Sequence, residues 1–137
     1  MTTAVNRERT LTELDHARLE RLLRDADPTA QTAPLEQVLD NAVLVATEDL
    51  AADIVTMNSE VLLETEGAGQ PRRIIIRYPA EADAATGGVS VLSPAGAGIL
   101  GTRVGDIVSW AGADGRPQVH RVKELIYQPE RSGDKLR

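Results

Sequence analysis

Residues 93–110 read SPAGAGILGTRVGDIVSW, and this stretch decides the fold of the chain. It contains the pattern G-x-G-x-x-G at Gly96, Gly98 and Gly101, which in dinucleotide-binding proteins follows a strand and opens a long helix. Only three residues separate Gly101 from the turn pair Gly105-Asp106, and the residues beyond that pair are β-branched and aromatic. The stretch therefore predicts a strand, a short helix begun by a proline, a turn and a new strand, and it disfavours nucleotide binding.

The composition of the 137-residue chain predicts one domain, or a compact domain with a small appendage. Cysteine is absent, so disulfide bonds and thiolate metal sites are excluded. No apolar run approaches the length of a membrane span, and the N-terminal residues lack the apolar core of a signal peptide. We therefore expect a soluble cytoplasmic protein that has no membrane partner.

The formal net charge of −6 is concentrated in the first part of the chain. Residues 1–50 carry five Arg against ten Asp or Glu, whereas residues 51–137 carry ten basic and eleven acidic residues. An acidic front half repels nucleic acid backbones and favours a basic protein surface, so we expect no strong direct binding of nucleic acid. Arg72, Arg73 and Arg77 could contact phosphate locally, but solvated charges on an edge strand are the simpler interpretation.

Apolar residues at helical spacing predict two amphipathic helices before residue 50. The first helix starts near Leu14, with Asp15 as its N-cap, and is stopped by Asp27-Pro28. The second helix begins at Pro34 and continues at helical spacing to Val45. The short polar loop between the two helices predicts an antiparallel helical hairpin.

The pattern changes to that of strands after an acidic connector at 47–53. We expect a turn at Asn58-Ser59, and Pro117 is tolerable only at the start of its strand. The second part is therefore an α+β domain of five or six strands with one short helix inserted late. The predicted organisation is an unpatterned and frayed segment at 1–9, the short hairpin at 10–50 and the sheet domain at 51–137. The expected strands are 54–57, 61–66, 72–78, 89–93, 107–110 and 119–127.

The central stretch also carries a family resemblance. Ser93-Pro94, Gly96, Leu100-Gly101 and Gly105-Asp106 match the pattern S-P-x-G-x-x-x-L-G-x-x-x-G-D. This pattern resembles the C-terminal domain of bacterial Gre-type (GreA/GreB) transcript-cleavage factors. It is also similar to their shorter relatives, the regulators of nucleoside diphosphate kinase, or Rnk family.

Three further segments extend the resemblance across residues 53–134. The segment DIVTMNS at 53–59 resembles the family segment that leads from the hairpin into the sheet domain. Asn58 stands where cleavage factors usually have Gly, and Asn also accepts a positive φ readily. The tripeptide Tyr-Pro-Ala at 78–80 fits as well, and the tail Tyr-Gln-Pro-Glu at 127–130 resembles the Rnk group more than the cleavage factors.

The resemblance implies both a fold and a partner. The Gre-type C-terminal domain has an FKBP-like fold, in which a twisted antiparallel sheet curls around a short helix. By the same analogy, the domain docks at the rim of the secondary channel of RNA polymerase. Ala95 is smaller than the apolar residue often found in the family, so the resemblance does not fix the strength of this contact. The implied contact residues are Ser93, Pro94, Ala95 and Gly96.

Hairpin length separates the two kinds of relative. Cleavage factors push a long coiled coil through the secondary channel, where two tip acids help to hold a catalytic Mg²⁺. About a dozen residues per helix would project only roughly 20 Å, which is too short for that path. We therefore expect a non-enzymatic regulator that binds polymerase, competes with the longer factors and needs no cofactor, metal or small-molecule substrate.

Two alternatives stay open at this stage. Asp25 and Asp27 lie near the hairpin tip and could pair as metal ligands, which would make the chain a Gre-type cleavage factor. Their spacing departs from the family's tip pair, and a helix stop is the simpler interpretation. The other alternative is a small interaction domain unrelated to polymerase. His16 and His120, the only histidines, lie on different predicted elements and do not indicate a metal or catalytic site.

Overall fold

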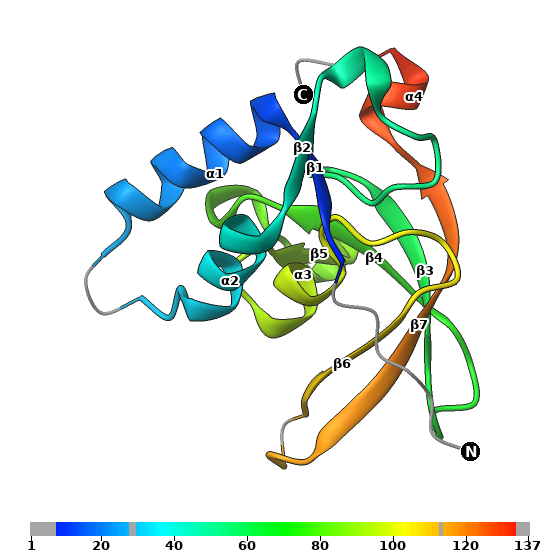
Figure 1. Ribbon diagram of the computed structural model, residues 1–137. Coiled ribbons are helices and arrows are strands. Elements are labelled where there is room, and N and C mark those ends of the chain that lie inside the picture. Colours follow the sequence, from blue (N-terminus) through cyan, green and yellow to red (C-terminus); the bar gives the residue numbers. More distant parts are fainter. Residues whose placement is uncertain (1–7, 28–29, 113, 134–137) are drawn as a thin grey trace.

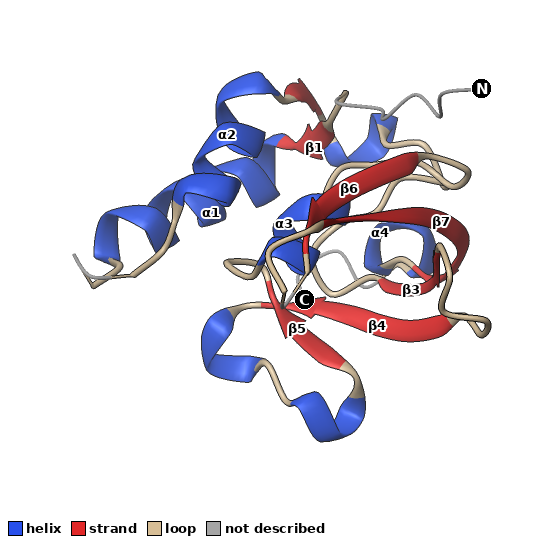
Figure 2. Cartoon of the chain, turned by 90° about the horizontal axis from the view of Figure 1, so that it is seen from below, coloured by secondary structure: helices blue, strands red, loops and turns tan. Residues whose placement is uncertain are grey.

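The computed structural model of the chain describes residues 8–27, 30–112 and 114–133 (Figure 1). Its main body is a five-stranded sheet of order β5-β4-β3-β7-β6 that curls around a short helix, α3 (Figure 2). The predicted α+β class and the late short helix are therefore confirmed. The elements of this body are β3 (Glu60–Thr65), β4 (Arg72–Arg77), β5 (Gly88–Ser90), α3 (Pro94–Ile99), β6 (Ile107–Ala111), β7 (Pro117–Tyr127) and α4 (Pro129–Ser132).

Strand pairing is antiparallel except at one edge of this sheet. β3 pairs antiparallel with β4 and β7, and β6 pairs antiparallel with β7. β5 instead pairs with β4 in parallel, so the expectation of a fully antiparallel sheet is wrong. The chain leaves β4 through two 3₁₀ turns, Pro79–Glu81 and Ala84–Thr86, and this crossover lets it return in the same direction. Ile74, Ile75 and Ile76 of β4 are all buried, as the apolar run predicts.

The predicted strand at 54–57 is wrong, because these residues form a buried irregular segment. Ile54 makes an isolated bridge with Arg103, and the backbone beyond it bonds to partners that belong to no single strand. The N–H of Val55 donates to the Thr102 carbonyl at 2.8 Å, and the N–H of Asn58 donates to the Ile76 carbonyl at 2.8 Å. Asn58 has φ 64°, which confirms the predicted turn.

Residues 10–45, here called the α1–α2 region, begin and end with short strands. The order is β1 (Thr10–Thr12), α1 (Glu13–Asp25), α2 (Ala33–Asn41) and β2 (Val43–Val45), and β1 pairs with β2 in parallel. The prediction that the second helix reaches Val45 is wrong, because the N–H of Val43 donates to the Arg9 carbonyl at 2.9 Å and starts a strand. Among the described helices, none is long and apolar enough to cross a bilayer.

The N-cap of α1 is Thr12 and not Asp15. Thr12 has the extended conformation of a cap, and its Oγ1 accepts the N–H of Asp15 at 3.0 Å. Asp15 lies inside the first turn, where its side chain is buried. The helix ends at Asp25, two residues before the predicted stop at Asp27, and Pro28 lies outside the described residues.

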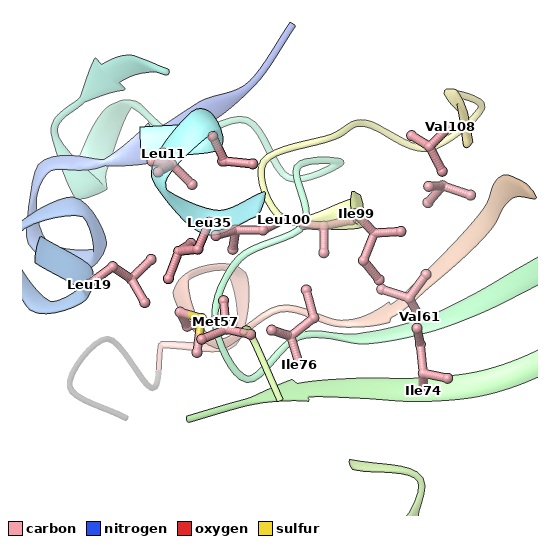
Figure 3. Close-up of a cluster of buried hydrophobic side chains, with 14 of the residues drawn as sticks. Leu11, Leu19, Leu35, Met57, Val61, Ile74, Ile76, Ile99, Leu100 and Val108 are labelled. Carbon is pink, nitrogen blue, oxygen red and sulfur yellow. The ribbon is translucent and has the colours of Figure 1, made fainter. Parts of the chain in front are cut away.

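The α1–α2 region and the sheet share a single cluster of buried apolar side chains (Figure 3). Leu11, Leu19 and Leu35 come from the α1–α2 region and are fully buried. Leu35 lies beside Leu100, the C-cap of α3, and the same cluster includes Ile76 of β4 (Figure 3). The apolar contact between the two parts is therefore continuous across the predicted boundary near residue 50.

Candidate functional site: the α3 loop and the end of α1

Ser93 starts α3 by capping it. Its backbone is extended (φ −72°, ψ 157°), its Oγ accepts the N–H of Gly96 at 3.1 Å, and it donates to the Ser90 carbonyl at 2.6 Å. Pro94 follows at the first helical position, where its missing N–H costs nothing. Pro94 is exposed and Ala95 is half-buried. Ser93 thus shapes the loop, while Pro94 and Ala95 present its surface.

The glycines of the G-x-G-x-x-G pattern serve packing and not phosphate binding. A Cβ at Gly96 would overlap the carbonyl of Ser90, and a Cβ at Gly98 would overlap the ring of Trp110. Gly101 has φ +79°, and a Cβ there would lie 3.0 Å from the Thr10 carbonyl oxygen. Gly96 and Gly98 therefore let α3 press against the sheet, and Gly101 lets β1 approach the turn after α3.

An open groove of about 690 Å³ lies between α2, α3 and β6, beside Pro94. Pro94, Val38 and Trp110 contribute apolar surface to it, and Arg9 is the one charged residue among the described residues that line it. Arg9 donates from Nη2 to the Gly98 carbonyl at 3.2 Å. Burial lowers the pKa of Arg9, and the carboxylate of Asp106 opposes this change.

Arg9 belongs to the segment at 1–9 that we expect to be frayed, and this expectation stays a prediction; residues 1–7 lie outside the described residues. Sequence reasoning missed Arg9 because the residues around it are polar and carry no periodic pattern. The partner groups of Arg9 lie far away in the chain, at Gly98 and Asp106. Only the tertiary fold could identify it as part of the groove.

The two candidate tip acids lie at the end of α1 that points away from the sheet (Figure 1). Asp25 is the last helical residue, and both Asp25 and Asp27 are exposed. The carbonyl of Asp27 accepts the N–H of Ala30 at 2.8 Å, which is ordinary turn chemistry. Within residues 8–27, 30–112 and 114–133, no group of three or more His, Cys, Asp or Glu side chains could hold a metal ion.

The two histidines lie apart and have structural partners. The side chain of His16 is only 18% exposed, and its ring nitrogens contact Glu20 at 3.1 Å and the Leu39 carbonyl at 3.2 Å. His120 is buried and stacks on Trp110, with ring centroids 3.8 Å apart. Burial and, to a smaller extent, the charge of Arg72 lower the pKa of His120. Within the part of the chain that the structure describes, neither histidine belongs to a group of three or more candidate metal ligands.

The basic cluster on β4 is largely engaged within the protein. Arg73 pairs with Glu60 at 2.8 Å, and Arg77 donates to the Asn58 side-chain oxygen at 3.0 Å. β5 pairs with β4 only at Ile75–Arg77, so the exposed Arg72 and Arg73 lie beyond this pairing, in line with edge-strand charges, whereas Arg77 pairs with Ser90 of β5 and does not fit that interpretation. The Glu60 carboxylate offsets the positive charge of Arg73, whereas Arg77 keeps its charge because its partner is a neutral amide.

Residues 50–127 match the family model described as "Transcription elongation factor, GreA/GreB, C-term". This match places the curled sheet and the α3 loop in the class of GreA/GreB C-terminal domains. The solved structure titled "Prokaryotic transcription elongation factor GreA/GreB from Nitrosomonas europaea" has a TM-score of 0.72 and 29% identity, and the match covers 89% of this chain and 100% of that one. The likeness of fold therefore extends beyond the sheet domain into the α1–α2 region.

The curated relatives narrow the class. "Regulator of nucleoside diphosphate kinase" of Escherichia coli strain K12 is 35% identical over 130 residues, covering 92% of this chain and 94% of the relative. "Transcription elongation factor GreA" of Limosilactobacillus fermentum is 36% identical over 74 residues, covering 54% of this chain but only 47% of that factor. The chain therefore belongs to the family of regulators of nucleoside diphosphate kinase, which shares the GreA/GreB C-terminal domain.

Proposed function

We propose that this protein is a transcription regulator that binds RNA polymerase at the rim of the secondary channel and does not support transcript cleavage. The family supports a transcription-factor-like role, because residues 50–127 match the C-terminal domain of elongation factors. In this proposal the domain at 51–137, with an FKBP-like arrangement of its sheet, binds polymerase. Residues 10–50 form a short helical hairpin, with coiled-coil packing, that reaches the channel mouth.

The observation that carries the proposal is the length of α1. It has 13 residues and α2 has 9, so α1 extends only about 20 Å. The chain also covers nearly all of the Escherichia coli regulator but less than half of the GreA factor. The short, acidic α1–α2 region would occupy the entrance of the channel. It would exclude a longer factor without reaching the catalytic centre.

The proposed contact with polymerase uses the exposed surface of the α3 loop. Pro94 and Ala95 supply that surface, while Ser93 and Gly96 are committed to the cap and to close packing. Pro94→Glu tests this division because glutamate is compatible with the first turn of a helix. The matched control is Pro79→Glu, since Pro79 is also exposed and also starts a short helical turn. We expect Pro94→Glu to weaken binding to purified core polymerase about tenfold or more, and Pro79→Glu to leave binding unchanged.

The absence of cleavage support is tested separately with stalled elongation complexes. We expect no shortening of the RNA when the protein is added at saturating concentration. Shortening that is lost in the double variant Asp25→Asn/Asp27→Asn would instead show a cleavage factor that uses these acids. Absence of binding to polymerase at about micromolar protein would favour the third possibility, an interaction domain unrelated to transcription.

A further inference from the structure

A buried carboxylate joins α1 to the segment at 54–59. The side chain of Asp15 is only 3% exposed, and its Oδ2 accepts the N–H of Met57 at 3.3 Å. Burial and the nearby Glu130 raise the pKa of Asp15 to about 6, while the bond from Met57 and the charge of Arg18 lower it. Asp15 therefore keeps a hydrogen bond to Met57 at a cost in desolvation.

The same segment is bonded to α4 on its other side. Thr56 and Ser59 are fully buried, and Thr56 Oγ1 donates to Glu130 Oε1 at 2.8 Å. Because that hydroxyl has one proton, Ser59 Oγ must be the donor in its own 2.8 Å contact with Thr56 Oγ1. Ser59 Oγ also accepts the N–H of Thr56 at 2.9 Å. The three residues thus form a fully directed chain of hydrogen bonds.

Gln128 holds α4 against the segment in a second place. Its side chain is 1% exposed and caps α4 by accepting the N–H of Arg131 at 3.0 Å. Its Nε2 donates to the carbonyls of Ile54 at 2.7 Å and Ala51 at 3.1 Å. The tail motif at 127–130 therefore fixes α4 to the segment, and the segment contacts α1 through Asp15.

We infer that Asp15, Thr56, Ser59 and Glu130, here called the junction clamp, set the direction in which α1 leaves the sheet domain. The inference rests on the proposed function, because this direction fixes where the end of α1 lies relative to the α3 loop. Apolar burial holds the α1–α2 region against the sheet domain but does not fix the angle between them, because the hydrophobic effect is non-directional. Hydrogen bonds do fix it, because their atoms must lie at particular distances and angles. Asp15 and Glu130 carry like charges, so stability alone does not account for placing both beside one buried segment. In this inference the clamp residues are positioning residues, which act on the direction of α1.

The direct test measures the distance between spin labels at Arg24→Cys on α1 and Arg116→Cys in the β6–β7 turn. The natural chain has no cysteine, so both labels attach uniquely, and both positions are exposed. Asp15→Leu and Thr56→Val remove clamp hydrogen bonds while keeping the number and branching of the side-chain heavy atoms. Asp15→Asn is the matched control, because its amide oxygen can still accept the N–H of Met57.

We expect one narrow distance distribution for the parent and for Asp15→Asn, and a broadened or shifted distribution for Asp15→Leu and Thr56→Val. Identical distributions in all four proteins, each folded by circular dichroism, would overturn the inference. If Asp15→Leu does not fold, Thr56→Val decides the outcome alone.

A second measurement links the clamp to function. We expect Asp15→Leu and Thr56→Val to need about tenfold more protein than Asp15→Asn to displace a cleavage factor from polymerase. Equal displacement by all variants, despite altered distances, would show that the clamp does not serve the partner. If even the parent displaces nothing, the proposed function fails, and the distance distributions still decide the structural inference.

Discussion

The curled sheet and the α1–α2 region differ in how their structures are encoded. In the sheet domain, several features follow from local signals: Ser93 and Pro94 start α3 where their residue types predict it, and Asn58 makes the predicted turn. In the α1–α2 region, the strands β1 and β2 have three residues each and pair across the two helices. The comparison teaches that residue types within a few positions encode the α3 loop, whereas contacts between distant residues hold the α1–α2 region against the sheet. Four stability predictions test this difference, from the largest effect to the smallest.

The largest effect is expected at the α3 loop. Gly96→Ala should destabilise the protein by about 3 kcal/mol or more, because the added Cβ overlaps the Ser90 carbonyl. Gly67→Ala is the control. Substitution at Gly67 strains the backbone because φ is +83°, but no atom lies within 4 Å of the added Cβ. We expect that control to cost about 1 kcal/mol. Equal losses in chemical denaturation would contradict the close packing at Gly96 as the cause of its larger effect.

The shared apolar cluster predicts that the two regions unfold together. Leu35→Ala should cost about 3 kcal/mol because the side chain is fully buried. Leu44→Ala, at a site that is 43% exposed, should cost less than about 1 kcal/mol. Trp110 is the only tryptophan, so its fluorescence follows the sheet while circular dichroism follows the helices. We expect coincident transitions in Leu35→Ala; a helical transition at lower denaturant would separate the regions.

Asp15 predicts a dependence of stability on pH. Its folded pKa of about 6 lies above the ordinary value of 3.8. The contribution of protonated Asp15 to the free energy of unfolding is therefore fully present below about pH 4 and is lost as pH rises through about 6. The charged form therefore costs up to about 3 kcal/mol at neutral or higher pH. Asp15→Asn should be more stable than the parent at about pH 8, by up to this amount, and the difference should shrink toward about pH 4. Denaturant titrations across this range check it, and a constant difference would refute the assignment.

The smallest effect concerns the caps of the two helices. Thr12→Ala should cost about 1 kcal/mol because Thr12 Oγ1 accepts the N–H of Asp15. Thr32 occupies the equivalent position of α2 but makes no side-chain bond to the helix backbone. Thr32→Ala should therefore cost less than about 0.5 kcal/mol. A loss in Thr12→Ala no larger than the loss in Thr32→Ala would contradict Thr12 as the N-cap of α1, and Asp15 would again be the candidate.

Much of the sheet could be predicted because its signals are local. The isoleucine run of β4, Pro117 at the start of β7 and the Gly105-Asp106 turn each act within a few residues. The parallel edge formed by β5 was not predictable, since nothing local reports the direction in which a chain returns after two 3₁₀ turns. Asp15 was misread as a cap because a polar residue near a helix start usually stays exposed. Its burial depends on Met57, which lies 42 positions further along.

The candidate site was predictable only in part. The pattern at Ser93–Gly96 identified the loop, and the structure adds that two of its four residues are committed to the fold. Arg9 could not be found, because its role depends on approaching α3 from the other end of the chain. The position of Asp25 at the end of α1 followed from helical spacing. Any role for Asp25 and Asp27 in the channel stays a prediction.

Displacement of a labelled cleavage factor from RNA polymerase tests the central claim most directly. We predict that increasing amounts of this protein release the factor completely from stalled elongation complexes, that Pro94→Glu releases it poorly, and that the RNA keeps its length. Simultaneous binding of both proteins, or shortening of the RNA by this protein alone, would contradict the account.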